Sequence, residues 1–225
     1  MLSELCLPLG MVRNDVSKMD ELIKERIRLP KGSALFHLGD KTEAVYGIRL
    51  GTIKTQLEDA SGQVQITGFL LPGEILGMDG LLNNTHTSHA IALEDSEVCV
   101  IRLEELDRLS THFPVLQQQF RRLMSKEINR SHQLVMSLAA LRSEQRLAAF
   151  LLSLSNRLSA LGYSPNEFVL RMSREEIGNY LGLTLETVSR LFSRFAREGL
   201  LHIHQREVHI LDMQALRQLS GSDCG

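Results

Sequence analysis

The stretch "SREEIGNYLGLTLETVSRLFSRFAREGLL", residues 173–201, carries the pattern of two helices joined by a tight turn. Ser173 can cap the first helix, and acidic residues follow it in the first turn, where they oppose the helix dipole favourably. Gly182 permits a sharp turn, because glycine adopts left-handed backbone angles at little cost, and Thr184 can cap the next helix. The sequence therefore predicts a helix, a glycine-containing turn and a second helix.

The second predicted helix has one apolar and one polar face. The apolar residues recur at the spacings that place side chains on the buried side of a helix, and they are Val188, Leu191, Phe192 and Phe195. The residues of the outward face are then Glu186, Ser189, Arg190, Ser193, Arg194 and Arg197. Two such helices describe a helix-turn-helix, in which the second helix lies in the major groove of DNA.

The residue types on the outward face suit DNA. Arg190 can donate two hydrogen bonds to guanine, Glu186 can accept one from cytosine, and Ser189 can contact several bases. Arg194 and Arg197 lie farther along the helix and suit phosphates, which set position without reading sequence. The complete predicted DNA-binding set is Thr184, Glu186, Thr187, Ser189, Arg190, Arg194 and Arg197. A merely solvated surface helix is the alternative.

Two neighbouring patterns complete the C-terminal part of the chain. The stretch "LLHIHQREVHIL", residues 200–211, predicts two short strands, a wing-like hairpin that favours the DNA-binding interpretation. Ahead of the helix pair, residues 143–163 predict an amphipathic helix ended by Gly162, and residues 167–172 predict a strand.

The N-terminal half has a different pattern. From about residue 23 to residue 101, short apolar pieces alternate with glycine-containing turns. The stretch "TIKTQLEDASGQVQITGF", residues 52–69, alternates apolar and polar residues on either side of "DASG", which predicts a hairpin. The regular spacing favours a compact antiparallel barrel or roll over a doubly wound sheet.

A long helix is predicted between the two halves. From Val115 to about Leu141 there is no Pro or Gly, and Pro114 occupies a favourable first-turn position. Such a helix of about 25 residues is about 38 Å long. It could span a core, but its apolar stripe continues in coiled-coil fashion, so we favour pairing with a second copy of the chain. The predicted dimer positions are Phe120, Met124, Ile128, Ser131, Val135 and Leu138.

Bulk composition limits the alternatives. The 225 residues suffice for one large domain or two modest ones. No apolar run approaches the roughly 20 residues that span a membrane, and there is no signal-peptide pattern, so we expect a cytoplasmic protein. The net charge is −2, and the segment 142–219 is mildly positive, which alone does not identify a nucleic-acid partner. There is no nucleophile–base pair or phosphate-cradling glycine loop, so we expect no enzyme.

With these residues assembled, the sequence resembles the CRP/FNR family of bacterial transcription regulators, and within it the oxygen-sensing FNR-like branch. The stretches that carry the resemblance are "IGNYLGLTLETVSRLFSRF", "EQRLAAFLLSLSNR", "RRLMSKEI", "QITGFLLPGEILGMDG" and "ALEDSEVCVI". The resemblance implies an α+β fold with an N-terminal β-roll related to cyclic-nucleotide-binding jelly rolls (residues 1–112), a dimerisation helix (113–141) and a winged helix-turn-helix (142–225). It also implies a homodimer on a palindrome with TTGAT-type half-sites, read by Glu186, Ser189 and Arg190, and RNA polymerase as a further partner.

The same resemblance argues against a cyclic nucleotide. The cyclic-nucleotide binders of the family carry a glutamate for the ribose where this chain has Met78. They carry an arginine for the cyclic phosphate near Thr87–His89, where this chain offers no cation for that role. We therefore expect no bound cyclic nucleotide.

The three cysteines bear on oxygen sensing. Three is an odd number, and the cysteines lie far apart in the sequence, so they do not form a disulfide framework. FNR-like sensors hold a [4Fe-4S] cluster on four cysteine thiolates, and Cys6 and Cys99 match the third and fourth of these ligands. In the pattern of the family, the second cysteine ligand would fall immediately before Met1. The sequence is compatible with a longer form that holds the cluster, with a regulator that lost it and is constitutive or responds to another effector such as haem-bound nitric oxide or a metabolite, or with replacement ligands.

Two sets of histidines are further candidate metal ligands. His86 and His89 lie in one polar loop, although such loops are more often only solvated. His202, His204 and His209 lie in the predicted wing, where no carboxylate or cysteine cluster accompanies them, so we expect no metal site there. In the long helix, Ser131 leaves the centre of the seam without an acidic residue, so we expect the chain to dimerise without any cluster.

Overall fold

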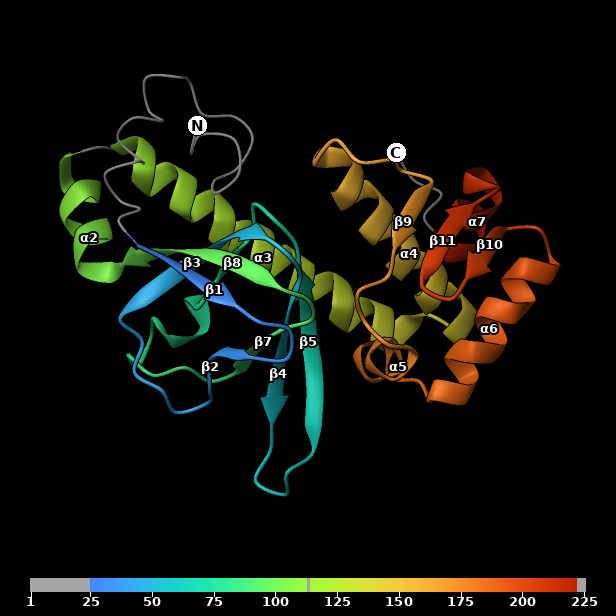
Figure 1. Ribbon diagram of the computed structural model, residues 1–225, viewed down its shortest axis with the longest axis horizontal. Helices are drawn as coiled ribbons and strands as arrows, with labels where there is room; N and C mark the ends of the chain where they lie inside the picture. Colours follow the sequence, from blue (N-terminus) through green and yellow to red (C-terminus); the bar gives the residue numbers. More distant parts are fainter. Residues whose placement is uncertain (1–24, 113, 222–225) are drawn as a thin grey trace. The chain divides into compact units, whose positions relative to one another are not determined.

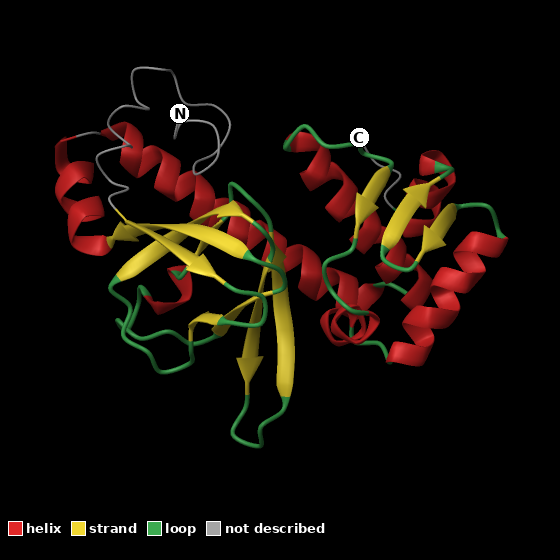
Figure 2. Ribbon diagram, in the orientation of Figure 1, coloured by secondary structure: helices red, strands yellow, loops and turns green. Residues whose placement is uncertain are grey.

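The structure is a computed structural model that describes residues 25–112 and 114–221 (Figure 1). The chain divides into two compact units, residues 1–131 and 132–225. The first unit is mainly antiparallel sheet, and the second combines helices with a small sheet (Figure 2). The predicted α+β class is confirmed.

Two four-stranded sheets form the N-terminal roll. The strands are β1 (Glu25–Leu29), β2 (Ala34–Phe36), β3 (Ala44–Leu50), β4 (Ile53–Glu58), β5 (Val64–Leu70), β6 (Ile75–Leu76), β7 (His89–Ala92) and β8 (Ser96–Arg102). One sheet has the order β1-β8-β3-β6 and the other the order β2-β7-β4-β5, with antiparallel neighbours throughout. A short 3-10 helix, η1 (Met78–Gly80), follows β6.

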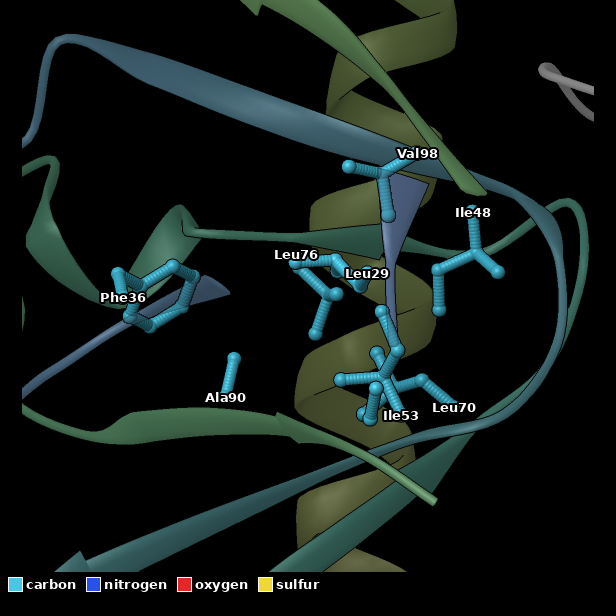
Figure 3. Packing of buried hydrophobic residues seen from close by; sticks show 9 residues of the cluster. Leu29, Phe36, Ile48, Ile53, Leu70, Leu76, Ala90 and Val98 are labelled. Atoms are coloured by element: carbon cyan, nitrogen blue, oxygen red, sulfur yellow. The ribbon is translucent and has the colours of Figure 1, made fainter. Parts of the chain in front are cut away.

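Apolar side chains from both sheets fill the interior of the roll. The cluster comprises Leu29, Phe36, Ile48, Ile53, Leu70, Leu76, Ala90, Ala92 and Val98 (Figure 3). Alternation along the strands sends these residues into the roll, whereas Val45, Ile75, Cys99 and Ile101, on the other face of the sheet that contains β3 and β8, are buried in a second cluster. The roll therefore has a continuous core of its own.

The hairpin predicted around "DASG" is confirmed, because β4 pairs with β5 from Ile53↔Leu70 to Glu58↔Val64. Asp59 organises its turn: Oδ1 accepts hydrogen bonds from the backbone N–H groups of Ser61 and Gln63 and from the Ser61 hydroxyl. These hydrogen bonds lower the pKa of Asp59 below its ordinary value. The turn thus carries a carboxylate that stays ionised on the surface of the roll.

Two helices follow the roll: α2 (Leu103–His112) and α3 (Pro114–Ala140). The long helix predicted from about residue 115 to 141 is confirmed as α3, 27 residues in length. The division between the two units falls within it, after Ser131.

The second unit contains α4 (Ser143–Ala160), β9 (Glu167–Val169), α5 (Arg174–Leu181), α6 (Leu185–Arg197), β10 (Leu201–His204), β11 (Glu207–Ile210) and α7 (Met213–Ser220). The three strands form an antiparallel sheet of order β10-β11-β9. The strand predicted over residues 167–172 is shorter than expected. The sequence did not predict α7, which packs against α4. Among the described residues, no helix is long and apolar enough to cross a membrane.

Candidate nucleic-acid interface

Helix α5 begins with a reciprocal cap. Ser173 Oγ accepts a hydrogen bond from the backbone N–H of Glu176 over 3.1 Å, and Glu176 Oε2 accepts one from the N–H of Ser173 over 2.7 Å. This capping box satisfies two backbone donors that a helix start otherwise leaves free. It fixes where the first of the two helices begins.

The turn between the two helices depends on two glycines. Gly182 ends α5 with φ 63°, in the left-handed region, as the sequence predicts. Gly178, inside α5, was not singled out from the sequence, yet a Cβ at this position would lie 2.6 Å from the carbonyl oxygen of Leu183. The turn therefore folds back so closely on α5 that only glycine fits.

Helix α6 is fixed on one side by its core residues. Val188, Phe192 and Phe195 are fully buried and Leu191 is nearly so. The four occupy the face predicted from their spacing, so the rotation of α6 about its axis is determined. Glu186 and Arg190 are consequently exposed, and Ser189 is half-buried.

The first turn of α6 carries a small polar network. Thr184 Oγ1 accepts the N–H of Thr187 over 3.2 Å and lies 3.1 Å from the Thr187 hydroxyl, which also accepts from Arg190 Nη2 over 3.4 Å. Hydrogen bonds from its own backbone N–H and from the Thr184 hydroxyl lower the pKa of Glu186. The helix start thus presents an ionised acceptor and a guanidinium donor, the pair needed to read base edges.

The two arginines predicted for phosphates differ in their surroundings. Arg194 forms ion pairs with Glu198 (Nε–Oε1, 2.7 Å) and with Glu144 of α4 (Nη1–Oε2, 2.5 Å). Arg197 is exposed. Arg194 therefore ties α6 to α4, and a phosphate would have to compete with two carboxylates for its charge.

The wing hairpin forms as predicted, with β10 paired to β11. His202 lies opposite His209, which in turn lies opposite Glu167 of β9, so all three share the outer face of the sheet. His209 Nδ1 is 3.5 Å from Glu167 Oε1. The sequence did not predict this contact, because β9 supplies the carboxylate from 42 residues earlier in the chain.

In the roll, Asp79 accepts hydrogen bonds from the loop at Thr87 and Ser88. This loop matches the phosphate-binding stretch of cyclic-nucleotide binders. Asp79 Oδ2 accepts the backbone N–H of Thr87 (2.9 Å), the N–H of Ser88 (3.0 Å) and the Ser88 hydroxyl (2.9 Å). His86 Nδ1 lies 3.2 Å from Oδ1. An internal carboxylate therefore occupies the donors that could otherwise bind an anion.

Cys99, in β8, is completely buried. It belongs to a second apolar cluster with Val45, Ile75, Ile101, Leu106 and Leu123. Cys6 and Cys224 lie outside the described residues. Since a [4Fe-4S] cluster takes four thiolates and the sequence has three cysteines, these residues do not supply a four-thiolate site. Among the described residues, no group of three or more His, Cys, Asp or Glu could hold a metal ion.

Known proteins match both units. The cyclic nucleotide-binding domain matches residues 26–112, and the Crp-like helix-turn-helix domain matches residues 145–219. The transcriptional regulatory protein Btr of Bordetella pertussis is 66% identical over 223 residues, which are 99% of this chain and 92% of that protein. The fumarate and nitrate reduction regulatory protein of Escherichia coli is 43% identical over 220 residues, 98% of this chain and 88% of that protein. The chain belongs to the CRP/FNR family, in its FNR-like branch.

A solved structure agrees with this assignment. FixK2 of Bradyrhizobium japonicum is 26% identical and superposes with a TM-score of 0.80, covering 87% of this chain and 96% of its own. These members of the CRP/FNR family are DNA-binding transcription regulators and not enzymes, and so is this chain.

Two arginines of this CRP/FNR regulator were not predicted from sequence. Arg174, the first residue of α5, places its guanidinium 3.8 Å from the centroid of the Phe192 ring, and burial lowers its pKa. Its Nη1 is buried and has no hydrogen-bond partner among the described residues. The only sequence signal for Arg174 is its position next to the capping residue Ser173.

Arg146 of α4 is the second. Its guanidinium donates to three backbone carbonyls: Leu141 (Nε, 2.9 Å), Leu181 (Nη1, 3.0 Å) and Leu138 (Nη2, 2.7 Å). Two of these carbonyls belong to the end of α3 and its following turn, and the third ends α5. Backbone acceptors leave no signal in the sequence, so this contact could not be predicted.

The side chains at the predicted dimer positions of α3 differ in how exposed they are. Met124, Ile128 and Val135 are 39%, 53% and 62% exposed, unusual values for large apolar side chains at heptad spacing. Ser131 is also exposed and Leu138 is half-buried. Phe120, in contrast, packs against the Cys99 cluster of the roll. Its side chain is therefore partly committed to the roll core.

Proposed function

We propose that this regulator binds a two-fold palindrome as a homodimer, with one FNR-like, TTGAT-type half-site per subunit. The observation that carries the proposal is the first turn of α6, where Glu186 and Arg190 face solvent while the opposite face is locked in the core. A helix held in this way presents the same side chains to each half-site. In the cytoplasm, its partners would be double-stranded DNA and, by family resemblance, RNA polymerase.

The homodimer is proposed from α3. Met124, Ile128 and Val135 leave apolar surface on a helix whose spacing suits a two-stranded coiled coil. Pairing with a second copy would remove this surface from water. Ser131, at the centre of the seam, adds no charge, so two such helices would meet there without repulsion.

Two candidates are proposed for the signal. The first is a response to oxygen or redox state through a [4Fe-4S] cluster, held by a longer form of the chain. The alternative is a regulator that responds to another small effector or is constitutively dimeric, and since Ser131 adds no charge to the seam, we expect this chain to dimerise and bind DNA without a cluster. The cluster-dependent candidate is supported by the E. coli relative, named for the reduction of fumarate and nitrate, and by the match of Cys6 and Cys99 to cluster ligands. When bound, such a cluster would supply oxygen-sensitive redox chemistry, and Cys6 and Cys99 would be two of its ligands.

One experiment tests DNA binding and the effector together. The chain is purified without oxygen, its iron and sulfide are measured, and its affinity for a palindromic TTGAT-type duplex is measured by fluorescence anisotropy before and after exposure to air. We expect no stoichiometric iron and an affinity that air does not change. Four irons per subunit, with an affinity lost in air, would instead establish the cluster-dependent candidate. No preference for the palindrome over a scrambled duplex would reject the proposed DNA site.

A further inference from the structure

One carboxylate of the roll meets a set of hydrogen-bond donors that would suit a bound anion. Asp79, in η1, places Oδ2 2.9 Å from the backbone nitrogen of Thr87 and 3.0 Å from that of Ser88. The hydroxyl oxygens of the same two residues lie 3.3 Å and 2.9 Å from Oδ2. Four donors from two consecutive residues therefore converge on one carboxylate oxygen.

The other oxygen of Asp79 has a partner in the same loop. Oδ1 lies 3.2 Å from Nδ1 of His86, whose side chain is 1% exposed. An ionised carboxylate only accepts hydrogen bonds, so His86 carries its proton on Nδ1 and donates it to Asp79. The imidazole ring stacks on Phe36 with centroids 3.7 Å apart, which holds this donor in place. Three consecutive residues thus direct donors at one carboxylate.

Two glycines fix the position of Asp79. Gly80 follows it, and a Cβ there would lie 1.8 Å from Oγ1 of Thr42, a side chain that is itself buried. Gly77 precedes η1 with φ 87°, in the left-handed region, and its Cβ would lie 3.2 Å from the carbonyl oxygen of Ala44. The segment that carries Asp79 therefore lies directly against the chain at Thr42 and Ala44, and the carboxylate is held in place in advance.

We propose that residues 86–88 form an anion-binding site whose ligand is the chain's own carboxylate, Asp79. Consecutive backbone N–H groups with flanking hydroxyls are the donors by which proteins bind carboxylate and phosphate groups. Here the ligand is covalently attached, so it joins η1 to the loop before β7 without any dissolved partner. The ligand class of the site is a single small carboxylate.

A dissolved anion competes poorly for this site. Asp79 is part of the same chain and is already positioned, so its effective concentration exceeds that of a free anion. Displacing it would also strip a half-buried carboxylate of its donors, which is costly. If the chain is the regulator proposed above, its effector is then not an anion bound at this loop. That consequence rests on the proposed function, whereas the site itself does not depend on DNA binding.

The test is rescue of Asp79→Ala by formate. Alanine removes the carboxylate but leaves the donors and the space, which formate, the smallest carboxylate, can fill. We expect Asp79→Ala to melt at a lower temperature than the parent in sodium chloride, and to recover part of the loss in sodium formate of equal concentration. The recovery should grow with the logarithm of the formate concentration, as for any ligand that binds only the folded state.

Asp59→Ala is the matched control. Asp59 Oδ1 also accepts two backbone N–H groups and one hydroxyl, but in the exposed turn of the hairpin, where water can replace it. General salt effects should move the parent and this control alike. A formate-dependent rise that is no larger in Asp79→Ala than in Asp59→Ala overturns the proposal.

Asp79→Asn separates site filling from general stabilisation. Its amide has nearly the size of the carboxylate and fills the space, so this variant should lose stability without being restored by formate. If formate stabilises Asp79→Asn as much as Asp79→Ala, the anion acts elsewhere and the proposal fails.

Hydrogen exchange in the parent covers variants that do not fold. The amide hydrogens of Thr87 and Ser88 lie in a loop, before β7 begins at His89. Because Asp79 holds both, they should exchange at least about tenfold more slowly than in an unfolded chain. Exchange of both amides at the unfolded rate overturns the proposal whatever the variants do.

Discussion

Arg146 Nη1 donates to the carbonyl oxygen of Leu181 over 3.0 Å, and this bond joins α4 to the last residue of α5. The same guanidinium also holds the carbonyls of Leu138 and Leu141. One side chain therefore sets the position of the helix-turn-helix relative to the end of α3 within the second unit. Hydrogen bonds from a charged donor are stronger than those from a neutral donor, and loss of the guanidinium would also leave these three carbonyls without it.

Replacing this side chain should loosen the DNA-binding unit. We expect Arg146→Ala to lower the free energy of unfolding of this unit by about 1.5–3 kcal/mol, the range for hydrogen bonds to charged groups. Thermal unfolding followed by circular dichroism measures the change. The control is Arg197→Ala, which removes an exposed arginine and should leave stability unchanged. Equal melting temperatures for both variants would contradict the assigned role of Arg146.

Arg190 and Arg197 should affect DNA binding in different ways. Arg190→Ala should lose about 1–3 kcal/mol of discrimination at one base pair of the half-site, because that guanidinium is expected to read a base. Arg197→Ala should weaken binding to all sequences alike and reduce the salt dependence by about one phosphate contact. Anisotropy titrations on single-base variants of the duplex at several salt concentrations measure both effects. If Arg190→Ala weakens all duplexes equally, Arg190 contacts phosphate.

Gly178→Ala should be destabilising, contrary to the usual effect in a helix. Alanine normally stabilises a helix interior by about 1 kcal/mol relative to glycine. Here the added Cβ would lie 2.6 Å from the Leu183 carbonyl oxygen, so the turn has to open. We expect a lower melting temperature and weaker DNA binding together. A Gly178→Ala variant as stable as the parent would show that the turn relaxes without cost.

A charge at position 131 should weaken the proposed dimer. Ser131→Asp places a carboxylate at the centre of the seam on each subunit, and like charges in close apposition repel. We expect a larger monomer fraction at micromolar concentration by analytical ultracentrifugation, and lower affinity for the palindrome. Ser131→Asn has nearly the same size without the charge and should remain dimeric. A parent that is already monomeric would reject the seam itself.

Asp79 predicts a pH dependence of the roll. Burial raises its pKa, but hydrogen bonds from Ser88, His86 and Thr87 outweigh this effect and leave the pKa below the ordinary 3.8. A carboxyl whose folded pKa is depressed stabilises the fold above its unfolded pKa and loses that contribution as pH falls through the folded value. The stability difference between the parent and Asp79→Asn should therefore be constant from about pH 5 to 7 and shrink below about pH 4. Urea unfolding across this range measures it, and a difference that stays constant well below the ordinary pKa of the carboxyl would exclude ionised Asp79 as the cause.

The sequence predicted what local patterns determine. Capping residues, Gly182 and the spacing from Val188 to Phe195 were sufficient for the helix-turn-helix, because each depends on neighbours within a few residues. The hairpin at Asp59 followed from the same kind of signal.

Contacts between distant segments could not be predicted. Arg146 binds backbone carbonyls, whose positions depend on how helices pack and not on residue type. His37 and His89 meet only because β2 pairs with β7, and Glu167 reaches His209 only because β9 pairs with β11. The sequence offered His86 and His89 together as candidate metal ligands, whereas in the structure His86 stacks on Phe36 and faces Asp79, and His89 lies beside His37.

The stacking of Arg174 on Phe192 connects the protein core to a charge at its surface. Phe192 is 1% exposed, so a survey of surface residues would pass over it, and a substitution such as Phe192→Leu would be classified as a packing change. Such a change would also release the guanidinium that the ring holds at the start of α5. Loss of DNA affinity in a folded core variant would then not mean that the core contacts DNA. The hydrophobic interior of this domain helps to determine its electrostatic surface.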